Sequence, residues 1–226
     1  MKKGLLCMVF AVLSAVTAFA QSGTGSVEQD IAKYTEAIRR NPNDAAAYNN
    51  RGAAYYYKGE YDRAIADYTE ALRLNPNHVV AYNNRGNAYK NKGEYDKAIA
   101  DFNEALRLNP NDANAYYNRG IAYDDKGERD RAIADYTEAL RLNPNLAEAY
   151  YNRGIAYGNK EEYDKEIADY TEALRLNPNN AMAYTNRGTA YYYKDDYARA
   201  RADWEKALQL DPTDATARNN LEVLWR

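Results

Sequence analysis

Side chains that could carry out catalysis are scarce in this sequence. The 226 residues include one histidine, His78, and one cysteine, Cys7. A Cys/His zinc site, a Ser-His-Asp triad and a Cys-His pair with its supporting groups each need more of these residues than the chain holds. No glycine-rich phosphate loop is present, and acidic pairs such as Glu161-Glu162 have the pattern of solvated charges. The sequence therefore predicts a protein that is not an enzyme and that has no cofactor and no metal site.

The side chains that remain for chemistry are charged groups, tyrosine and asparagine. Lysine and arginine together number 30 and the acids 33, so the formal net charge is −3. A nucleic-acid binder would carry a basic face, so this balance argues against that class of partner. Tyrosine is abundant, at 24 residues against 3 phenylalanines. Contacts made through aromatic rings are therefore the main chemistry that the composition offers.

Arginine and aspartate recur at regular positions. The arginines are Arg51, Arg85, Arg119, Arg153 and Arg187, and the aspartates that follow them are Asp67, Asp101, Asp135, Asp169 and Asp203. Our structural interpretation is that each arginine stem packs and its head pairs with one of these acids. The alternative is that the arginine heads bind an anion.

The elements that must position these side chains follow a strict period. All six prolines lie 34 residues apart, at Pro42, Pro76, Pro110, Pro144, Pro178 and Pro212. Residues 45–78 read AAAYNNRGAAYYYKGEYDRAIADYTEALRLNPNH, and this phrase recurs with few changes at 79–112, 113–146, 147–180 and 181–214. We call these segments repeats 1 to 5. A fixed period of this size predicts a solenoid, in which each repeat is stable only when stacked on its neighbours.

Each repeat has the pattern of two helices. In repeat 1 the i, i+4, i+7 spacing of a first helix is given by Tyr48, Gly52 and Tyr55, and a second helix follows from Tyr61. Gly59 between them suits a left-handed helix end. Gly52 and Ala64 are small, so the two helices can approach closely, and Asn77 is a candidate cap for the next helix.

The repeats resemble the tetratricopeptide repeat family, whose signature is also 34 residues long. The matching residues of repeat 1 are Tyr48, Gly52, Tyr55, Ala64, Tyr68 and Pro76, and repeats 2 and 3 match at Tyr82, Gly86, Tyr89, Ala98, Phe102, Pro110, Tyr116, Gly120, Tyr123, Ala132, Tyr136 and Pro144. The resemblance implies an all-α fold, a right-handed α-solenoid of stacked helix-turn-helix repeats. Residues 27–44 match only a second helix, a half repeat, and 215–226 match only a first helix, so we expect both to cap the stack.

The N-terminus has the pattern of a targeting segment. Lys2 and Lys3 precede an apolar run that ends at Ala18-Phe19-Ala20, after which the chain becomes polar. This order predicts a signal peptide over residues 1–20 that is cleaved after Ala20, followed by a linker over 21–26. The expected location is the periplasm or outside the cell, with no membrane contact after cleavage. The alternative is an uncleaved anchor, although the run is short for a membrane span of about 20 residues.

A candidate binding surface lies on the first-helix face away from the core. Helical geometry places Ala46, Asn49, Asn50, Ala53, Tyr56 and Tyr57 there in repeat 1. The resemblance implies that this face lines a concave groove for extended peptides. The predicted groove residues are six tyrosines outside the signature positions and a ladder of asparagines: Tyr56, Tyr57, Tyr117, Tyr151, Tyr192, Tyr193, Asn50, Asn84, Asn118, Asn152 and Asn186.

Both residue types suit a peptide. Tyrosine rings give contact area at low entropic cost, and an asparagine amide offers a donor and an acceptor to a peptide main chain. The resemblance supports the asparagines, since related scaffolds hold peptide main chain with asparagine at this position. The alternatives are that the tyrosines only fill a repeat rich in alanine and tyrosine, and that the asparagines only solvate an exposed face.

The predicted groove carries little positive charge. Lys90 lies in it, but so do Asp124 and Asp125. Family members that clamp a peptide carboxylate use lysine and arginine in this groove. The positions where such residues would help hold Asn49, Asn83, Tyr117, Tyr151 and Thr185. We therefore expect no such clamp, and we expect the partner segment to be weakly charged.

Repeat 4 departs from the pattern at two positions. Glu161 replaces the glycine between the helices, and Glu166 replaces the small alanine of the second helix. We predict that residues 158–168 form the weakest seam of the stack.

The sequence favours a noncatalytic, exported scaffold that binds another protein or a peptide. Two other functions stay open. Tyrosine faces and asparagine amides also suit a cell-wall glycan, and a solenoid could act structurally through self-association.

Overall fold

A computed structural model describes residues 26–224, which form twelve helices and no strand. The predicted signal peptide, and the linker up to residue 25, lie outside the described residues. The helices are α1 (Val27–Arg40), α2 (Ala45–Tyr57), α3 (Tyr61–Leu74), α4 (Val79–Asn91), α5 (Tyr95–Leu108), α6 (Ala113–Asp125), α7 (Arg129–Leu142), α8 (Ala147–Gly158), α9 (Tyr163–Leu176), α10 (Ala181–Tyr193), α11 (Tyr197–Leu210) and α12 (Ala215–Leu224). The fold is an all-α solenoid.

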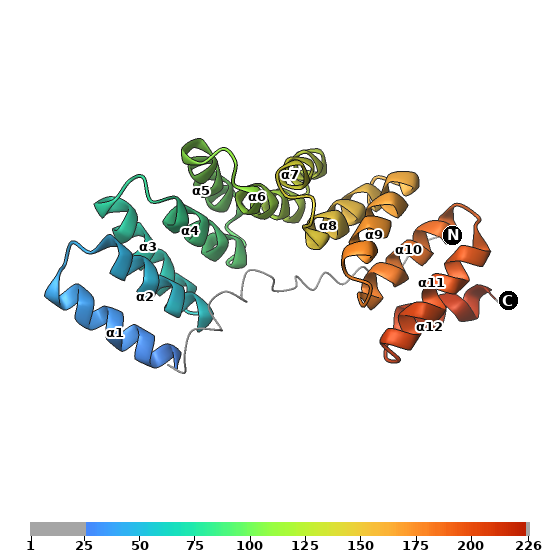
Figure 1. Cartoon of the computed structure of the whole chain (residues 1–226), viewed down its shortest axis with the longest axis horizontal. Helices are drawn as coiled ribbons and strands as arrows, with labels where there is room; N and C mark the ends of the chain where they lie inside the picture. Colours follow the sequence, from blue (N-terminus) through green and yellow to red (C-terminus); the bar gives the residue numbers. More distant parts are fainter. Residues whose placement is uncertain (1–25, 225–226) are drawn as a thin grey trace.

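The helices stack in chain order. Each repeat pairs its first helix with its second, as α2 with α3, and each second helix then packs on the first helix of the next repeat, as α3 on α4. The first helices also contact one another, α2 with α4, α4 with α6, and α6 with α8. The stack therefore curves toward its first helices, and Figure 1 shows α4, α6 and α8 on the inner side of the arc, below α5 and α7.

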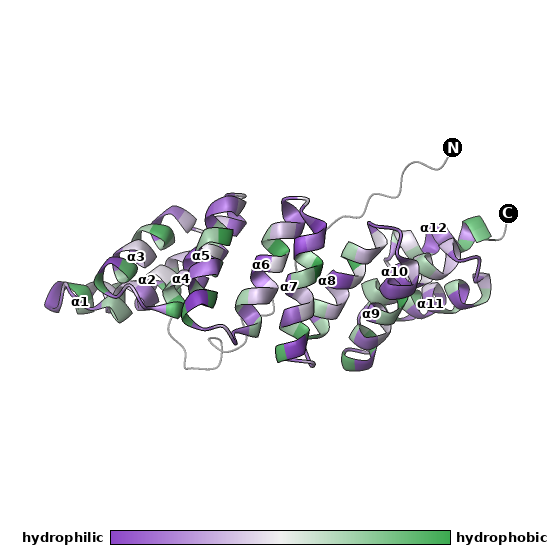
Figure 2. Cartoon of the chain, turned by 90° about the horizontal axis from the view of Figure 1, so that it is seen from above, coloured by the Kyte–Doolittle hydropathy of each residue, from purple (hydrophilic) through white to green (hydrophobic). Residues whose placement is uncertain are grey.

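The core of each repeat is built from small side chains around one buried ring. Tyr68 of α3 is 1% exposed, and a Cβ added to Gly52 of α2 would lie 2.8 Å from its Cε1 atom. The predicted close approach of the two helices at glycine is thus confirmed. Figure 2 shows hydrophobic and hydrophilic residues interleaved along the helices, with no single large apolar region.

The signature tyrosines of the first helices are less buried than a core position implies. Tyr48 and Tyr55 are only half-buried, because Ala47, Gly52 and Ala54 occupy the tightest contacts of α2. The Arg51 guanidinium lies 5.6 Å from the centre of the Tyr48 ring and 6.0 Å from that of Tyr55, which suits a cation–π contact. These rings therefore pack on an arginine as well as on apolar atoms.

The predicted pairing of arginine with aspartate is confirmed in all five repeats. In repeat 1, Arg51 donates Nε and Nη2 to the two Asp67 oxygens, at 2.8 and 2.7 Å. Its Nη1 donates to Thr35 of the preceding second helix at 3.2 Å. The hydrogen bonds to Asp67 raise the pKa of Arg51. The same three bonds recur at Arg85, Arg119, Arg153 and Arg187. The arginine heads are thus occupied within the protein, which does not favour the anion-binding alternative.

The turns confirm one sequence prediction and overturn another. Gly59 has φ +77°, the left-handed conformation expected of it. Glu161 adopts φ +60° at the equivalent place, which strains a side-chain-bearing residue. Asn77 does not cap the next helix: the N-cap residue is His78, and the Asn77 N–H donates to the Asn75 side chain at 3.1 Å. The turn that contains Pro76 therefore ends at His78, one residue later than expected, because Asn75 forms this local bond.

Within residues 26–224, no helix is long and apolar enough to cross a membrane. The same residues contain no group of three or more His, Cys, Asp or Glu side chains placed to hold a metal ion.

Candidate functional site

The candidate site is the inner face, which we define as the surface of α2, α4, α6, α8 and α10 that lines the concave side of the arc. Each helix places a side chain here at five equivalent positions, because a 34-residue period keeps every repeat in the same orientation. In repeat 1 these positions are Ala46, Asn49, Asn50, Ala53 and Tyr56, followed by Tyr57 near the end of α2.

The six predicted groove tyrosines fall into two groups. Tyr57 and Tyr193 are 40% and 43% exposed. The others, Tyr56, Tyr117, Tyr151 and Tyr192, are half-buried. The Tyr117 ring lies 6.0 Å from that of Tyr136, and the Tyr151 ring lies 5.6 Å from that of Tyr170. These four rings therefore cover the core of their own repeat and offer a partner only part of their surface.

The asparagine ladder connects consecutive repeats. Asn84 donates to the Asn49 side chain at 3.1 Å, Asn152 to the Tyr117 hydroxyl at 3.0 Å, and Asn186 to the Tyr151 hydroxyl at 3.1 Å. Asn50 accepts a hydrogen bond from Asn49 at 3.3 Å. Asn118 makes no side-chain hydrogen bond to any part of the chain that the structure describes. Of the five ladder amides, Asn118 thus has its full bonding capacity left for a partner.

Aromatic rings gather near both ends of the inner face. In repeat 1, the Tyr56 ring lies 6.0 Å from that of Tyr57 and 5.5 Å from that of Tyr61. Repeat 5 repeats this arrangement with Tyr192, Tyr193 and Tyr197 at 6.0 and 5.5 Å. Tyr193 also stacks on Tyr163 of α9, with ring centres 5.2 Å apart. Sequence analysis did not single out Tyr61, Tyr163 or Tyr197, because they belong to second helices and were counted as core.

The middle of the inner face is charged. Burial lowers the pKa of Lys90, and Asp125 acts against this. Burial raises the pKa of Asp124 and of Asp125, while Arg129 and Lys90 respectively lower them. Partial burial is unfavourable to the charged form of each of these groups. None of the three forms an ion pair within residues 26–224.

Glu166 reaches this face from a second helix. It is 8% exposed, and its Oε1 atom lies 2.6 Å from the place that a Cβ on Gly158 would take. Burial raises the pKa of Glu166 to about 8, although a hydrogen bond from the Tyr170 hydroxyl lowers it. The carboxyl thus occupies the position where the other repeats have the side chains of Tyr56, Lys90, Asp124 and Tyr192.

The positions of a carboxylate clamp hold no basic residue, and their side chains bond within the stack. Asn83 donates to Asp112 at 2.8 Å, and Thr185 donates to Asp214 at 2.6 Å. These acceptors are the residues that precede α6 and α12, so the bonds fix one repeat to the next.

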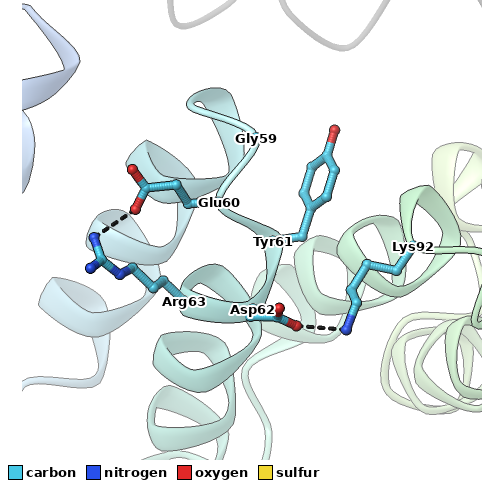
Figure 3. Close-up of a pocket in the computed structure, with 6 residues that line it drawn as sticks. All are labelled: Gly59, Glu60, Tyr61, Asp62, Arg63 and Lys92. Atoms are coloured by element: carbon cyan, nitrogen blue, oxygen red, sulfur yellow. Dashed lines mark hydrogen bonds and ion pairs between the residues drawn. The ribbon is translucent and has the colours of Figure 1, made fainter.

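A surface pocket lies at the turn between α2 and α3, and Tyr61 is shared between its lining and the ring cluster at that end of the inner face. Figure 3 shows its lining residues, which are Gly59, Glu60, Tyr61, Asp62, Arg63 and Lys92. Its charges are paired: Arg63 donates to Glu60 at 2.7 Å and Lys92 to Asp62 at 2.6 Å. The Lys92–Asp62 bond joins repeat 2 to repeat 1, so we assign this pocket a structural role.

Comparison with known proteins identifies the repeats. A family model described as "Tetratricopeptide repeat" matches residues 45–78, 79–112, 113–146, 147–180 and 181–214. No curated protein matches the chain. Among solved structures, YrrB, described as a TPR protein with an unusual peptide-binding site, is 28% identical with a TM-score of 0.71, and the match covers 84% of this chain and 97% of YrrB.

Two further similar structures are of MamA. One MamA protein is 31% identical with a TM-score of 0.69, over 76% of this chain and 93% of its own. MamA 41-end from Desulfovibrio magneticus RS-1 is 26% identical with a TM-score of 0.70, over 76% and 97%.

Proposed function

The chain belongs to the tetratricopeptide repeat family, and on that premise we propose that it is an exported, noncatalytic scaffold that binds an extended, weakly charged peptide along its inner face. Its repeats are those of a family of protein-interaction scaffolds. The observation that carries the proposal is the arrangement of that face, where exposed rings at both ends flank amide and carboxylate side chains.

Two kinds of contact support this function. The exposed rings of Tyr57 and Tyr193 offer rigid contact area, as aromatic residues do at protein interfaces. Asn118 offers an amide donor and acceptor with no competing bond in the described chain, which matches the donor and acceptor of a peptide unit. The similarity to YrrB, a TPR protein described by its peptide-binding site, is consistent with this use of the fold.

The experiment that tests the function is selection of random 12-residue peptides on the immobilised, purified chain, followed by calorimetric titration. We expect Asn118→Ala and Tyr193→Ala each to weaken binding of the selected peptides about five- to thirtyfold, the effect of losing a hydrogen bond or an aromatic contact. The matched control is Asn179→Ala, an exposed residue of the turn before α10. Recovery of no peptide, or equal binding by all variants, would exclude the inner face as a peptide site.

Export is the second part of the proposal and rests on the order of residues 1–26 alone. It is tested by N-terminal sequencing of the protein recovered from the cell envelope and the medium. A start at Gln21 is the expected result. A chain that keeps Met1, or that stays in the cytoplasm, would contradict export while leaving peptide binding intact.

A further inference from the structure

One bond of the asparagine ladder is not formed. Three asparagines of the first helices each donate, at 3.0 or 3.1 Å, to the residue 35 positions earlier in the preceding repeat: Asn84 to Asn49, Asn152 to Tyr117 and Asn186 to Tyr151. We call each of these bonds a rung. The equivalent pair at the joint between repeats 2 and 3 is Asn118 and Asn83, which no hydrogen bond joins. We call this pair the open rung.

Both halves of the open rung have unused bonding capacity. The Oδ1 atom of Asn83 is buried and accepts no hydrogen bond, and in the described part of the chain it is the one buried side-chain polar atom in this state. Asn118 makes no side-chain hydrogen bond to any residue between 26 and 224. A buried acceptor without a donor is costly in free energy, so a group that supplies a donor here should be bound favourably.

The period of the stack places the two halves next to each other. Asn84 and Asn49 are the same residue types with the same separation, and they bond at 3.1 Å one joint earlier. The joint between repeats 2 and 3 is otherwise regular, since Arg119 donates across it to Asn103 at 2.6 Å, as the other arginines do at their joints. The open rung is therefore a local difference between the amides and not a gap between the repeats.

The Asn83 amide is held in place from the next repeat. Its Nδ2 donates to one oxygen of Asp112 at 2.8 Å, and the other Asp112 oxygen caps α6 by accepting the Ala115 N–H at 3.1 Å. Turning the Asn83 amide would break this bond, so a donor has to come to its oxygen. Asn118 has no such bond and can turn to admit a donor. Both residues are half-buried, so the open rung borders the surface of the inner face.

We propose that the open rung receives a primary amide side chain of the bound peptide, a glutamine or an asparagine, which donates to Asn83 Oδ1 and accepts from Asn118 Nδ2. This inference rests on the proposed function and adds the chemistry of one residue of the partner.

The chemistry of the two halves favours a primary amide over other groups. Its NH₂ and C=O share one carbon atom, so the end of one side chain can bond both halves. The N–H and C=O of a trans peptide unit point in opposite directions, so a single main-chain unit cannot do so. A carboxylate lacks the donor, and an ammonium or guanidinium group lacks the acceptor. A hydroxyl would have to bond both halves through one oxygen.

The state of the open rung in the free protein is tested by urea unfolding of the full chain. We expect Asn152→Ala, which breaks a formed rung, to unfold at a lower urea concentration than the wild type. Asn118→Ala should unfold at the wild-type concentration, because it breaks no bond. An equal loss for the two variants would show that Asn118 already bonds within the protein, and would overturn the inference.

The chemistry of the ligand is tested by selection of random 12-residue peptides on the wild type, Asn83→Thr and Asn179→Thr, each verified as folded by circular dichroism. Thr185 takes the place of Asn83 in repeat 5 and donates to Asp214 at 2.6 Å, so Asn83→Thr should keep the bond to Asp112 while removing the amide oxygen. The control, Asn179→Thr, makes the same change in an exposed turn. We expect glutamine or asparagine to be enriched at one peptide position on the wild type and the control, but not on Asn83→Thr.

A double-mutant cycle then links that peptide residue to Asn83. Replacing the selected glutamine by methionine, or asparagine by leucine, removes the amide at similar size. By calorimetry we expect this change to weaken binding to the wild type about five- to tenfold, the effect of losing two neutral hydrogen bonds. On Asn83→Thr the same change should weaken binding less than about twofold, because the partner atom is already absent.

The outcomes separate this inference from the proposed function. Peptides without an enriched amide residue, equal enrichment on all three forms, or a cycle without coupling would overturn the inference and leave peptide binding standing. Recovery of no peptide would overturn both.

Discussion

Each repeat is joined to its predecessor by one arginine. Arg119 holds Asp135 of its own repeat through two bonds of 2.7 Å and Asn103 of the repeat before through one of 2.6 Å. Its side chain is largely buried, so the guanidinium bonds in a medium of low dielectric where a lost partner is costly. Lysine cannot reproduce this geometry, because its ammonium lacks the planar fork.

We therefore predict that Asp135→Asn destabilises the protein by roughly 2–4 kcal/mol, measured by urea unfolding. The control is Glu104→Gln, which breaks the exposed ion pair with Arg107 and should cost less than about 1 kcal/mol. Equal losses for the two variants would show that the buried network contributes no more than a surface pair.

A single residue, Glu166, also makes the stability of the fold depend on pH. Its pKa is about 8 in the fold against 4.5 in an ordinary glutamate, so between these values the folded chain binds more protons than the unfolded one. The stability that this group contributes is therefore full below pH 4.5 and is lost as the pH rises from 4.5 to 8. We predict that Glu166→Gln unfolds at a higher urea concentration than wild type at pH 8 and that the difference shrinks toward pH 5. A difference that is independent of pH would contradict this.

For single side chains, the sequence predicts the pairing of arginine with aspartate but not every contact. Arginine and aspartate recur with the period of the repeat, so their partnership was visible. The bond from Asn152 to Tyr117 was not, because it joins side chains of two repeats whose relative rotation depends on packing. For the same reason the sequence placed Tyr117 and Tyr151 on the helix face away from the core, and could not show that their rings lie 6.0 and 5.6 Å from the buried rings of Tyr136 and Tyr170.

The turn between the two helices of a repeat requires a residue with positive φ, which limits the residue types that suit it. Three repeats turn from first to second helix through a glycine of positive φ, and repeats 4 and 5 do so through Glu161 and Asp195, both at φ +60°. A side chain in this conformation costs about 1–2 kcal/mol relative to glycine.

We expect Glu161→Gly to raise the stability by about 1 kcal/mol in thermal unfolding, since strain is relieved while the chain gains some unfolded-state entropy. The reciprocal variant Gly127→Ala should lower it by a similar amount. No change in either would mean that the turn relaxes without cost.

The helices themselves followed from the 3.6-residue spacing, while their caps did not. His78 and Leu146 stand at N-cap positions without a side-chain bond, and Asp44, Asp112 and Asn180 cap the equivalent helices. Once the N-cap position is known, the preference for Asp and Asn explains which helices are capped, and the stack holds the helices after His78 and Leu146 in place without a cap.

The whole molecule is a one-dimensional stack, so its stability should vary along its length. Helix α1 contains no buried residue, since it packs on α2 alone. We predict by hydrogen exchange that α1 and α12 exchange fastest, and that residues 158–168 are the least protected segment inside the stack. Equal or greater protection of 158–168 relative to the matching segment of repeat 3 would refute the predicted seam.

The two terminal helices are poorly suited to join end to end. Asp30 of α1 stands where repeat 1 has Ala64, and Glu222 of α12 stands where it has Gly52. In a continued solenoid Glu222 would lie against the ring of Tyr34. At the equivalent place in repeat 1, the close contact of Gly52 with the Tyr68 ring leaves no room for a side chain. We expect light scattering of the purified chain to give the mass of a monomer across concentrations. A mass that grows with concentration would instead support a self-associating structural role.

Because the same contacts join each repeat to the next, the chain should tolerate the loss of a whole repeat. If recombination removed residues 113–146, Arg153 would meet Asn103, which already serves Arg119 in the same way. The shortened product should therefore fold, with a helical circular dichroism spectrum, yet it would lack Asp124 and Asp125. Changes in the number of repeats would thus alter the side chains of the inner face while every intermediate protein still folds.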